Sequence, residues 1–263
     1  MSRRLALPAA LVTSLLLGAC AAAPAAPPLT DPNEILIKSV ETLTKTKSVH
    51  FAASLTGTFT GDLMGSGQES EFKLDGTTAE GDLDISGKKF RLSFSVPSFL
   101  GLNGELIQVG QNTYVKTSLT GAKYSKETST ELPVDEVTDP AKAGEGVREF
   151  LELPGVEPTK VADATCGDNK DCYQVEIDLS SEDLAGLASA APAAGADLDE
   201  ASMKVTFGVE KESLRLSKIT ISMEAAQQGS ADLTLNMTKW DESVSINEPP
   251  ADQVTEGGGL LGG

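Results

Sequence analysis

Apolar and polar residues alternate along most of the chain, and this alternation predicts short β-strands. Between residues 49 and 59, Val49, Phe51, Leu55 and Phe59 alternate with polar or small neighbours, which is the period of a strand with one buried face. The same period recurs at 72–74, 83–85, 90–96, 107–109, 113–115, 173–179, 203–209, 214–216, 219–221, 233–237 and 244–246. Gly, Asn or Asp separates most of these segments, so the pattern predicts roughly ten strands in an antiparallel meander.

Helical periodicity is confined to three segments. The first, residues 31–46, begins with an Asp N-cap followed by Pro and has Glu three residues after the cap, which is the signature of a helix start. A second helix is expected to begin at Asp139 and a third at Ser180 or Ser181. Each of the three carries apolar residues on one face, so each is expected to pack against the sheet.

This inventory predicts an α+β fold whose sheet is strongly bent. Ten strands spaced about 4.8 Å apart make a sheet about 45 Å wide, whereas three helices about 10 Å in diameter cover only about 30 Å of it. A flat sheet would therefore leave apolar side chains in water. We expect an antiparallel half-barrel with the helices on its concave side. The alternation alone does not distinguish a packed interior from a hollow one.

The first twenty residues have the features of an export signal. Arg3 and Arg4 precede an apolar run at 5–17 that is too short to span a bilayer and ends in small residues. Residues 17–20, Leu-Gly-Ala-Cys, resemble a bacterial lipobox, in which Cys20 takes a diacylglyceryl group and becomes the new N-terminus. The alternative is a plain signal peptide that leaves Cys20 free. The lipobox places the protein on the extracytoplasmic side of the cell membrane, in the cell envelope, held by fatty acids such as palmitate.

The chain is expected to have four parts. Residues 1–19 are the lipoprotein signal peptide, and residues 20–30 are the lipidated cysteine with an Ala- and Pro-rich tether. Residues 31–254 have the length of one all-β or α+β domain. Residues 255–263 form a Gly-rich tail that is expected to be disordered.

The composition is strongly acidic. The chain has 39 Asp and Glu against 21 Lys and Arg, a formal net charge of −18, and cleavage of the signal peptide would also remove Arg3 and Arg4. Such a surface repels nucleic acid, so we expect no nucleic-acid partner. Polybasic clusters that could bind anionic head groups are not found in the sequence, so the lipid anchor is expected to hold the membrane.

Cys166 and Cys172 are the only cysteines besides Cys20. Outside the cytoplasm they are expected to form a disulfide across a turn. A metal site is the alternative, but no histidine lies near them in the sequence and two thiolates do not complete a zinc site. We expect neither a metal nor a cofactor.

No catalytic signature is found in the sequence. Gly-x-Ser-x-Gly, His-Glu-x-x-His and the phosphate-binding Gly-Lys-Ser/Thr motif do not occur, and the single histidine, His50, falls on the polar side of a predicted strand. The many carboxylates leave a paired-acid hydrolase open, but one Trp and three Tyr offer little aromatic surface for sugars. We expect a protein that is not an enzyme.

The end of the chain resembles a known family. Trp240, Val244 and Ile246 followed by Pro-Pro-Ala-Asp-Gln-Val are similar to the closing segment of the LppX/LprA/LprF/LprG family of actinobacterial lipoproteins. The lipobox, the helix before the Ser-Val-His-Phe segment at 48–51, the strand at 114–115 and the Asp-Pro pair at 139–140 fit the same family. The likeness covers most of residues 33–254.

This resemblance implies a half-barrel that encloses an apolar cavity for acylated lipids or lipoglycans of the cell envelope, as in the outer-membrane lipoprotein carriers of Gram-negative bacteria. The expected function is lipid binding with transport or presentation, and a membrane lipid transporter is a candidate partner. The candidate cavity-lining residues are Leu36, Val40, Leu43, Phe51, Leu55, Phe94, Val147, Phe150, Leu151, Val205, Phe207 and Ile221. For each of them, ordinary core packing is the alternative.

A second interpretation is a surface interaction or scaffold lipoprotein without enzymatic activity. In this case the core would be packed, and the acidic surface would meet a basic partner or keep the protein soluble. Acidic runs such as residues 131–139 are also typical of ordinary solvated loops. The two interpretations differ in whether the inner face of the sheet is filled.

Overall fold

A computed structural model describes residues 28–61, 70–128, 140–190, 200–226 and 228–256. Thirteen strands form one open, curled sheet in the order β13-β7-β6-β5-β4-β3-β1-β12-β11-β10-β9-β8, with β2 paired to β1. The strands are β1 (Ser48–Gly61), β2 (Ser70–Lys73), β3 (Thr77–Asp84), β4 (Lys89–Val96), β5 (Leu102–Val109), β6 (Asn112–Thr117), β7 (Tyr124–Thr128), β8 (Thr159–Cys166), β9 (Lys170–Leu179), β10 (Ala201–Glu210), β11 (Leu216–Ala225), β12 (Gly229–Thr238) and β13 (Val254–Glu256). The α+β half-barrel expected from the sequence is confirmed.

In the described residues three α-helices accompany the sheet, at the expected places: α1 (Pro32–Leu43), α3 (Pro140–Leu151) and α4 (Ser181–Ala190). The Asp31 carboxylate caps α1, because it accepts hydrogen bonds from the backbone N–H groups of Asn33 and Glu34 at 2.9 and 3.3 Å. The cap satisfies two of the backbone donors that a helix start leaves free. Helix α1 ends at Leu43, three residues before the expected end.

The strand register shows which side chains share a face of the sheet. Phe207 of β10 lies opposite Ile219 of β11, which lies opposite Leu235 of β12. Leu235 in turn lies opposite Ala53 of β1. Residues directly opposite each other in a sheet point to the same side, and Phe207 packs against the cluster that contains Leu36 of α1. We call this side, on which α1 packs, the inner face and the other side the outer face.

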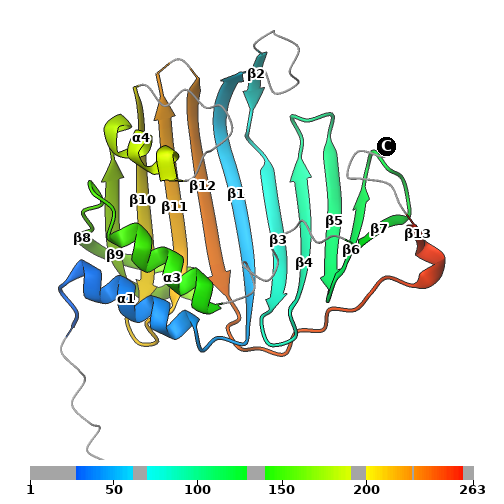
Figure 1. The fold of residues 1–263 in the computed structure, drawn as a ribbon, viewed down its shortest axis with the longest axis horizontal. Helices are drawn as coiled ribbons and strands as arrows, with labels where there is room; N and C mark the ends of the chain where they lie inside the picture. The colour runs from blue at the N-terminus through cyan, green and yellow to red at the C-terminus, as the bar shows by residue number, and fades with distance from the viewer. Residues whose placement is uncertain (1–27, 62–69, 129–139, 191–199, 227, 257–263) are drawn as a thin grey trace, which may run out of the picture.

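The helices cover only one half of the inner face. Figure 1 shows α1, α3 and α4 in front of strands β8–β12, while the described helices leave β3–β7 uncovered. Ile35 and Leu36 of α1 form one buried cluster with Val175 and Ile177 of β9, among others. The interior of the protein is therefore packed between these helices and β9–β10.

The outer face has its own smaller cluster at the other end of the sheet. The C-terminal segment, residues 239–253, runs from β12 to β13 and places Ile246 against Ile107, Tyr114 and Tyr124. The sequence predicted a strand at 244–246, and this prediction is wrong. The alternation arises because Ile246 is buried against the cluster while its neighbours face solvent. The segment itself pairs with none of the described strands there.

The strand count of roughly ten was too low because several paired segments lack a clear alternation. Strand β8 lies at one edge of the sheet, and most of its side chains are exposed. Strand β13 pairs in parallel with β7 and includes residues 255–256, which were expected in the tail. The expected strand at 214–216 is a turn up to Arg215, with β11 beginning at Leu216. The acidic run at 131–139 lies outside the described residues.

The expected pairing of Cys166 with Cys172 is confirmed as a disulfide. It joins the end of β8 to the beginning of β9 across the short 3-10 helix η1 (Gly167–Asn169), with the two Cα atoms 6.0 Å apart. Both cysteines are buried. The disulfide therefore supports the β8–β9 hairpin, whose edge strand β8 buries few side chains.

Candidate functional site

The inner face of the central strands forms an apolar strip that the described helices do not bury. We define the central strip as the inner-face apolar side chains of β12, β1, β3, β4 and β5, which the register places side by side. Its half-buried members are Leu233, Leu235, Met237, Phe51, Ala53, Leu55, Ala79, Leu83, Phe90, Leu92, Phe94, Val96, Leu102 and Leu106. Val49 of β1, at the end of the same face, is buried. A contiguous apolar area of this extent is typical of a binding surface.

Two aromatic rings of the strip lie over glycines of neighbouring strands. A Cβ atom built on Gly81 would lie 2.9 Å from the Phe51 ring, and one built on Gly104 would lie 2.7 Å from the Phe94 ring. Both distances are shorter than carbon atoms allow, so a side chain at either glycine would displace the ring. The same Cβ atoms would also lie too close to the carbonyl oxygens of Arg91 and Lys116. The rings therefore lie low against the sheet instead of standing away from it.

The floor of the strip between these rings is made of small side chains. Ala53 of β1 lies opposite Ala79 of β3, and Ala79 lies opposite Phe94 of β4. Glycine and alanine side chains leave space above the sheet that Leu or Phe at the same positions would fill. The result is a low apolar centre with larger side chains on either side of it.

Polar side chains border part of the strip on strands β5 and β6, beside the apolar Val115 that lies opposite Leu106. Gln108 of β5 lies opposite Thr113 of β6 on the inner face, and both are buried. The Gln108 Nε2 group donates to the carbonyl oxygen of Gly110 at 3.2 Å. The strip is thus an apolar area with a partly polar border on this side.

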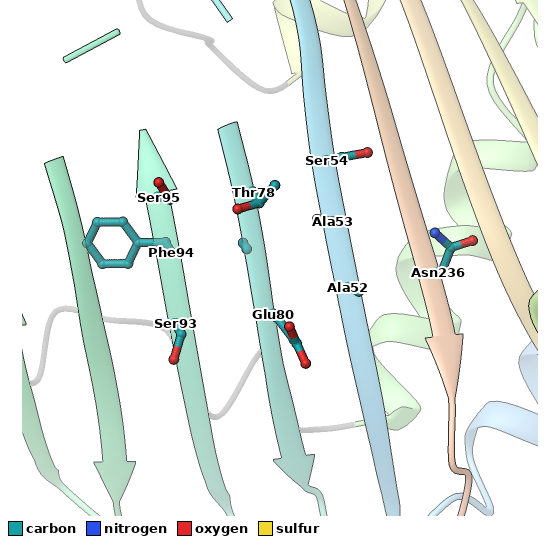
Figure 2. Close-up of a pocket in the computed structure, with 10 residues that line it drawn as sticks. Ala52, Ala53, Ser54, Thr78, Glu80, Ser93, Phe94, Ser95 and Asn236 are labelled. Carbon is teal, nitrogen blue, oxygen red and sulfur yellow. The ribbon is translucent and has the colours of Figure 1, made fainter. Parts of the chain in front are cut away.

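The outer face of the same strands is polar. It has a shallow groove, and Figure 2 shows Ser54, Thr78, Glu80, Ser93, Ser95 and Asn236 among the side chains that line it. His50, expected on the polar side of its strand, lies on this face with Nδ1 2.8 Å from Asp82 Oδ1. Serine, threonine and carboxylate groups hold water, so this groove does not suit a hydrocarbon chain.

Glu105 is a largely enclosed acid on this outer face, with 14% of its side chain exposed. Burial alone would raise the pKa of its carboxyl. Hydrogen bonds from the Tyr124 hydroxyl and from Arg91, together with the charges of Arg91 and Lys116, outweigh that effect and hold the pKa below its usual 4.5. The carboxylate is therefore ionised and fully partnered, which indicates a structural role.

The predicted lining residues are distributed over both halves of the inner face. Phe51, Leu55 and Phe94 lie in the central strip, and Val205, Phe207 and Ile221 lie on the same face of β10 and β11.

On the helices, Leu36 and Val40 are buried, Leu43 and Val147 are half-buried, and Phe150 and Leu151 pack against the core cluster. Whether these residues contact a ligand stays a prediction.

Sequence reasoning missed most of the strip. Ala53, Ala79, Leu92 and Leu235 were not among the predicted lining residues, although they lie directly beside those that were. Alanine and glycine do not stand out in an alternating pattern. The only available signal was the strand pairing itself, which sets a small residue opposite each large one.

The described residues offer neither a clustered metal site nor a membrane-spanning helix. Among them, no group of three or more His, Cys, Asp or Glu side chains is arranged to hold a metal ion. No helix in the described ranges is both long and apolar enough to cross a membrane.

Comparison with known proteins identifies the fold. Neither a family model nor a curated protein sequence matches the chain. The solved structures that match most of it include LprF from Mycobacterium bovis, with 15% identity, 84% of this chain and 98% of that chain covered and a TM-score of 0.53. They also include the lipoprotein LppX from Mycobacterium tuberculosis, with 18% identity, 83% and 100% covered and a TM-score of 0.51. The chain has the fold of LprF and LppX. The resemblance expected from the closing segment is thereby confirmed at the level of the fold, and the central strip lies on the inner face of this LppX-like half-barrel.

Proposed function

We propose that this protein is an envelope lipoprotein that binds acyl chains of lipids or glycolipids along the central strip and carries or presents them. The observation that carries the proposal is the contrast between the filled half of the inner face and the half-buried strip beside it. Apolar side chains that a folded protein leaves partly in water are stabilised by an apolar ligand, at about 25 cal/mol per Å² of surface removed from water.

The shape of the strip suits a hydrocarbon chain. Its low floor at Ala53 and Ala79 lies beside the rings of Phe51 and Phe94, so a chain lying there would contact apolar atoms on several sides. An acyl chain gains about 0.8 kcal/mol per buried methylene. A chain of ordinary length would therefore bind without any polar contact, and the head group would stay at the rim.

The remaining features of the proposed function rest on the sequence. Acylation at Cys20 after removal of the signal peptide would anchor the protein on the extracytoplasmic side of the membrane. Two or more acyl chains hold a protein far more durably than one. No step of this proposal requires chemistry by the protein, so we propose a carrier without enzymatic activity, for which a membrane lipid transporter is a candidate partner.

Native mass spectrometry tests whether the strip holds a lipid. The mature chain from residue 20 onward, with Cys20→Ser to remove the anchor, would be secreted into the oxidising periplasm of a bacterial host and purified without detergent. We expect added mass from a co-purified lipid at near one-to-one ratio, which solvent extraction would release for identification. A clean protein mass that persists after incubation with envelope lipids would contradict the proposal and favour the scaffold interpretation.

A matched pair of variants locates the bound lipid. Ala53→Trp fills the floor of the strip, whereas Ala52→Trp places the same side chain one residue earlier, in the open groove of the outer face. We expect Ala53→Trp to lose the lipid and Ala52→Trp to keep it. Equal retention by both variants would show that the lipid lies elsewhere.

The anchor has a separate test. Cys20→Ser should release the protein from the membrane fraction while its lipid content stays the same, because tether and strip are different parts of the chain. A wild-type protein whose mass carries no acyl group at Cys20 would contradict the anchor and leave the proposal for the strip untouched.

A further inference from the structure

Two leucines stand in solvent at neighbouring turns of the sheet. Leu100, in the turn between β4 and β5, is 80% exposed, and Leu119, in the turn between β6 and β7, is 47% exposed. We call the turns 97–101 and 118–121 the leucine tip. Strands β5 and β6 are paired, so the two turns lie at the same end of the sheet, away from α1.

The backbone of the first turn does not favour leucine at this position. Leu100 has φ of 53° and Gly101 has φ of 67°, so both residues are in the left-handed region, where a side chain is strained. Glycine or asparagine would suit residue 100 better. Leu100 also gains almost no burial, so neither backbone nor packing in the fold accounts for a leucine here.

Hydrogen bonds hold the backbone of both turns of the tip. The Gly101 N–H donates to the carbonyl oxygen of Pro97 at 3.1 Å, and the Ser118 N–H donates to the carbonyl oxygen of Asn103 at 2.8 Å. The side chains of Thr117 and Thr120 close the second turn at 3.1 Å. These bonds define the path of both turns, and the two leucine side chains are exposed on them.

The tip has no charge in a strongly acidic chain. Residues 96–104 and 117–122 contain no Asp, Glu, Lys or Arg, and the next residue is Lys123. Most of the surface would be repelled by anionic lipids, but the two turns themselves carry none of that charge. Asp75 lies in the adjacent turn between β2 and β3, where Gly76 faces Pro97. The apolar inner face also reaches the tip, because Val96 and Leu102 are paired at the base of the first turn.

We infer that the leucine tip inserts into the surface of a lipid bilayer. The side chains of Leu100 and Leu119 enter the boundary between head groups and acyl chains, and Lys123 stays among the head groups. This docks the end of the central strip at the membrane from which or to which a lipid would move. The inference goes beyond the proposed lipid binding, and its test needs no lipid in the strip.

Site-specific fluorescence quenching tests the insertion. Leu100→Cys and Leu119→Cys, made singly in the full exported chain, would be labelled with a polarity-sensitive dye and mixed with phosphatidylcholine vesicles that contain brominated acyl chains. The control is Glu212→Cys, an exposed residue in the β10–β11 turn at the opposite end of the sheet. This control lies nearer the N-terminal tether, because the Leu29 N–H is bonded to the Tyr173 hydroxyl at 3.0 Å near the start of β9.

We expect quenching at positions 100 and 119 to exceed that at 212 by about threefold or more, as for groups that lie about 5–10 Å deep in the interface. Adding Leu119→Asp should abolish quenching of the dye at 100, because a carboxylate resists transfer into the apolar boundary. Equal quenching at all three positions, or none at the tip, would overturn the inference. Mass spectrometry of the labelled protein distinguishes failure of the tip from failure of the anchor. A second dye on Cys20 would show that this thiol is free and would contradict its acylation. The tip would then be tested in the same variants with Cys20→Ser added.

Discussion

Strands β9 and β4 belong to one sheet and show the same apolar alternation, but their inner side chains lie in different surroundings. Val175 and Ile177 of β9 are completely buried under α1, whereas Leu92 and Phe94 of β4 are only half-buried. Burial of one half supports folding, and partial exposure of the other half leaves apolar area for a ligand. The difference shows that alternation marks the apolar face of a strand without saying what covers it.

The largest expected effect on the free energy of unfolding comes from truncating a leucine to alanine in each half of the sheet. Leu179→Ala in β9 removes a 3% exposed side chain from the core cluster and should lower the free energy of unfolding by about 3 kcal/mol, because such cavities in packed cores cost about 2–5 kcal/mol. Leu92→Ala in the strip should cost about 1 kcal/mol, since that side chain is only partly removed from solvent in the folded protein. Urea unfolding of lipid-free protein measures both, and equal losses would show that the two halves are packed alike.

Lipid binding should stabilise the two halves unequally. A single-chain phospholipid at about 100 times its dissociation constant should raise the free energy of unfolding by about 2.7 kcal/mol. Hydrogen exchange of backbone amides should slow most in β1, β3 and β4, where the strip lies, and least in β9 and β10. Protection that is strongest in β9 and β10 would place the ligand under the helices and would argue against the strip.

A smaller effect is expected from two glycines of α3, the helix over the filled half. A Cβ atom on Gly144 would lie 2.9 Å from Val40 of α1, whereas Gly146 has open space around it. Gly146→Ala should therefore raise the free energy of unfolding by about 0.5–1 kcal/mol through helix propensity. Gly144→Ala should lower it by about 1 kcal/mol because it pushes the helices apart. A gain from both variants, measured by thermal unfolding, would mean that α1 and α3 do not touch closely.

The smallest effect concerns pH and the outer face. The pKa of Glu105 is lowered in the folded protein, so its contribution to stability is present above pH 4.5 and is lost as the pH falls through the folded pKa. Glu105→Gln should flatten the fall in stability below pH 4.5. Asp163, beside Lys160 and Lys211, also has a lowered pKa but is more exposed, so Asp163→Asn should change the pH dependence less. Urea unfolding across this pH range compares the two variants.

The sequence predicted the elements whose physics is local. The Asp-Pro start of α1 reflects a helix cap formed by neighbouring residues. The alternation from Val49 to Phe59 reflects one apolar face of a single strand. Strands β8 and β13 were missed because they lie at the edges of the sheet and bury few side chains. Their pairing depends on a neighbouring strand and leaves no period in the sequence.

The central strip could be predicted only in part for a related reason. Phe51 and Phe94 were predicted from their apolar character, but Gly81 and Gly104 gain meaning only from the rings that lie over them. Phe51 lies opposite Met237, which is far away in the chain. Such neighbours are set by the register of distant strands, so the floor of the strip could not be predicted from local patterns.

The C-terminal segment has a mechanical consequence for this curved sheet. It is fastened near the start of β1, where the Asp241 N–H donates to the carbonyl oxygen of Ser48 at 3.0 Å. It is fastened again at the far edge through β13, with Ile246 between these points on the outer side. A segment that follows the convex side of a curved sheet is stretched when the sheet curls further and slackens when the sheet opens. The segment therefore resists further curling of the sheet and keeps its two halves apart.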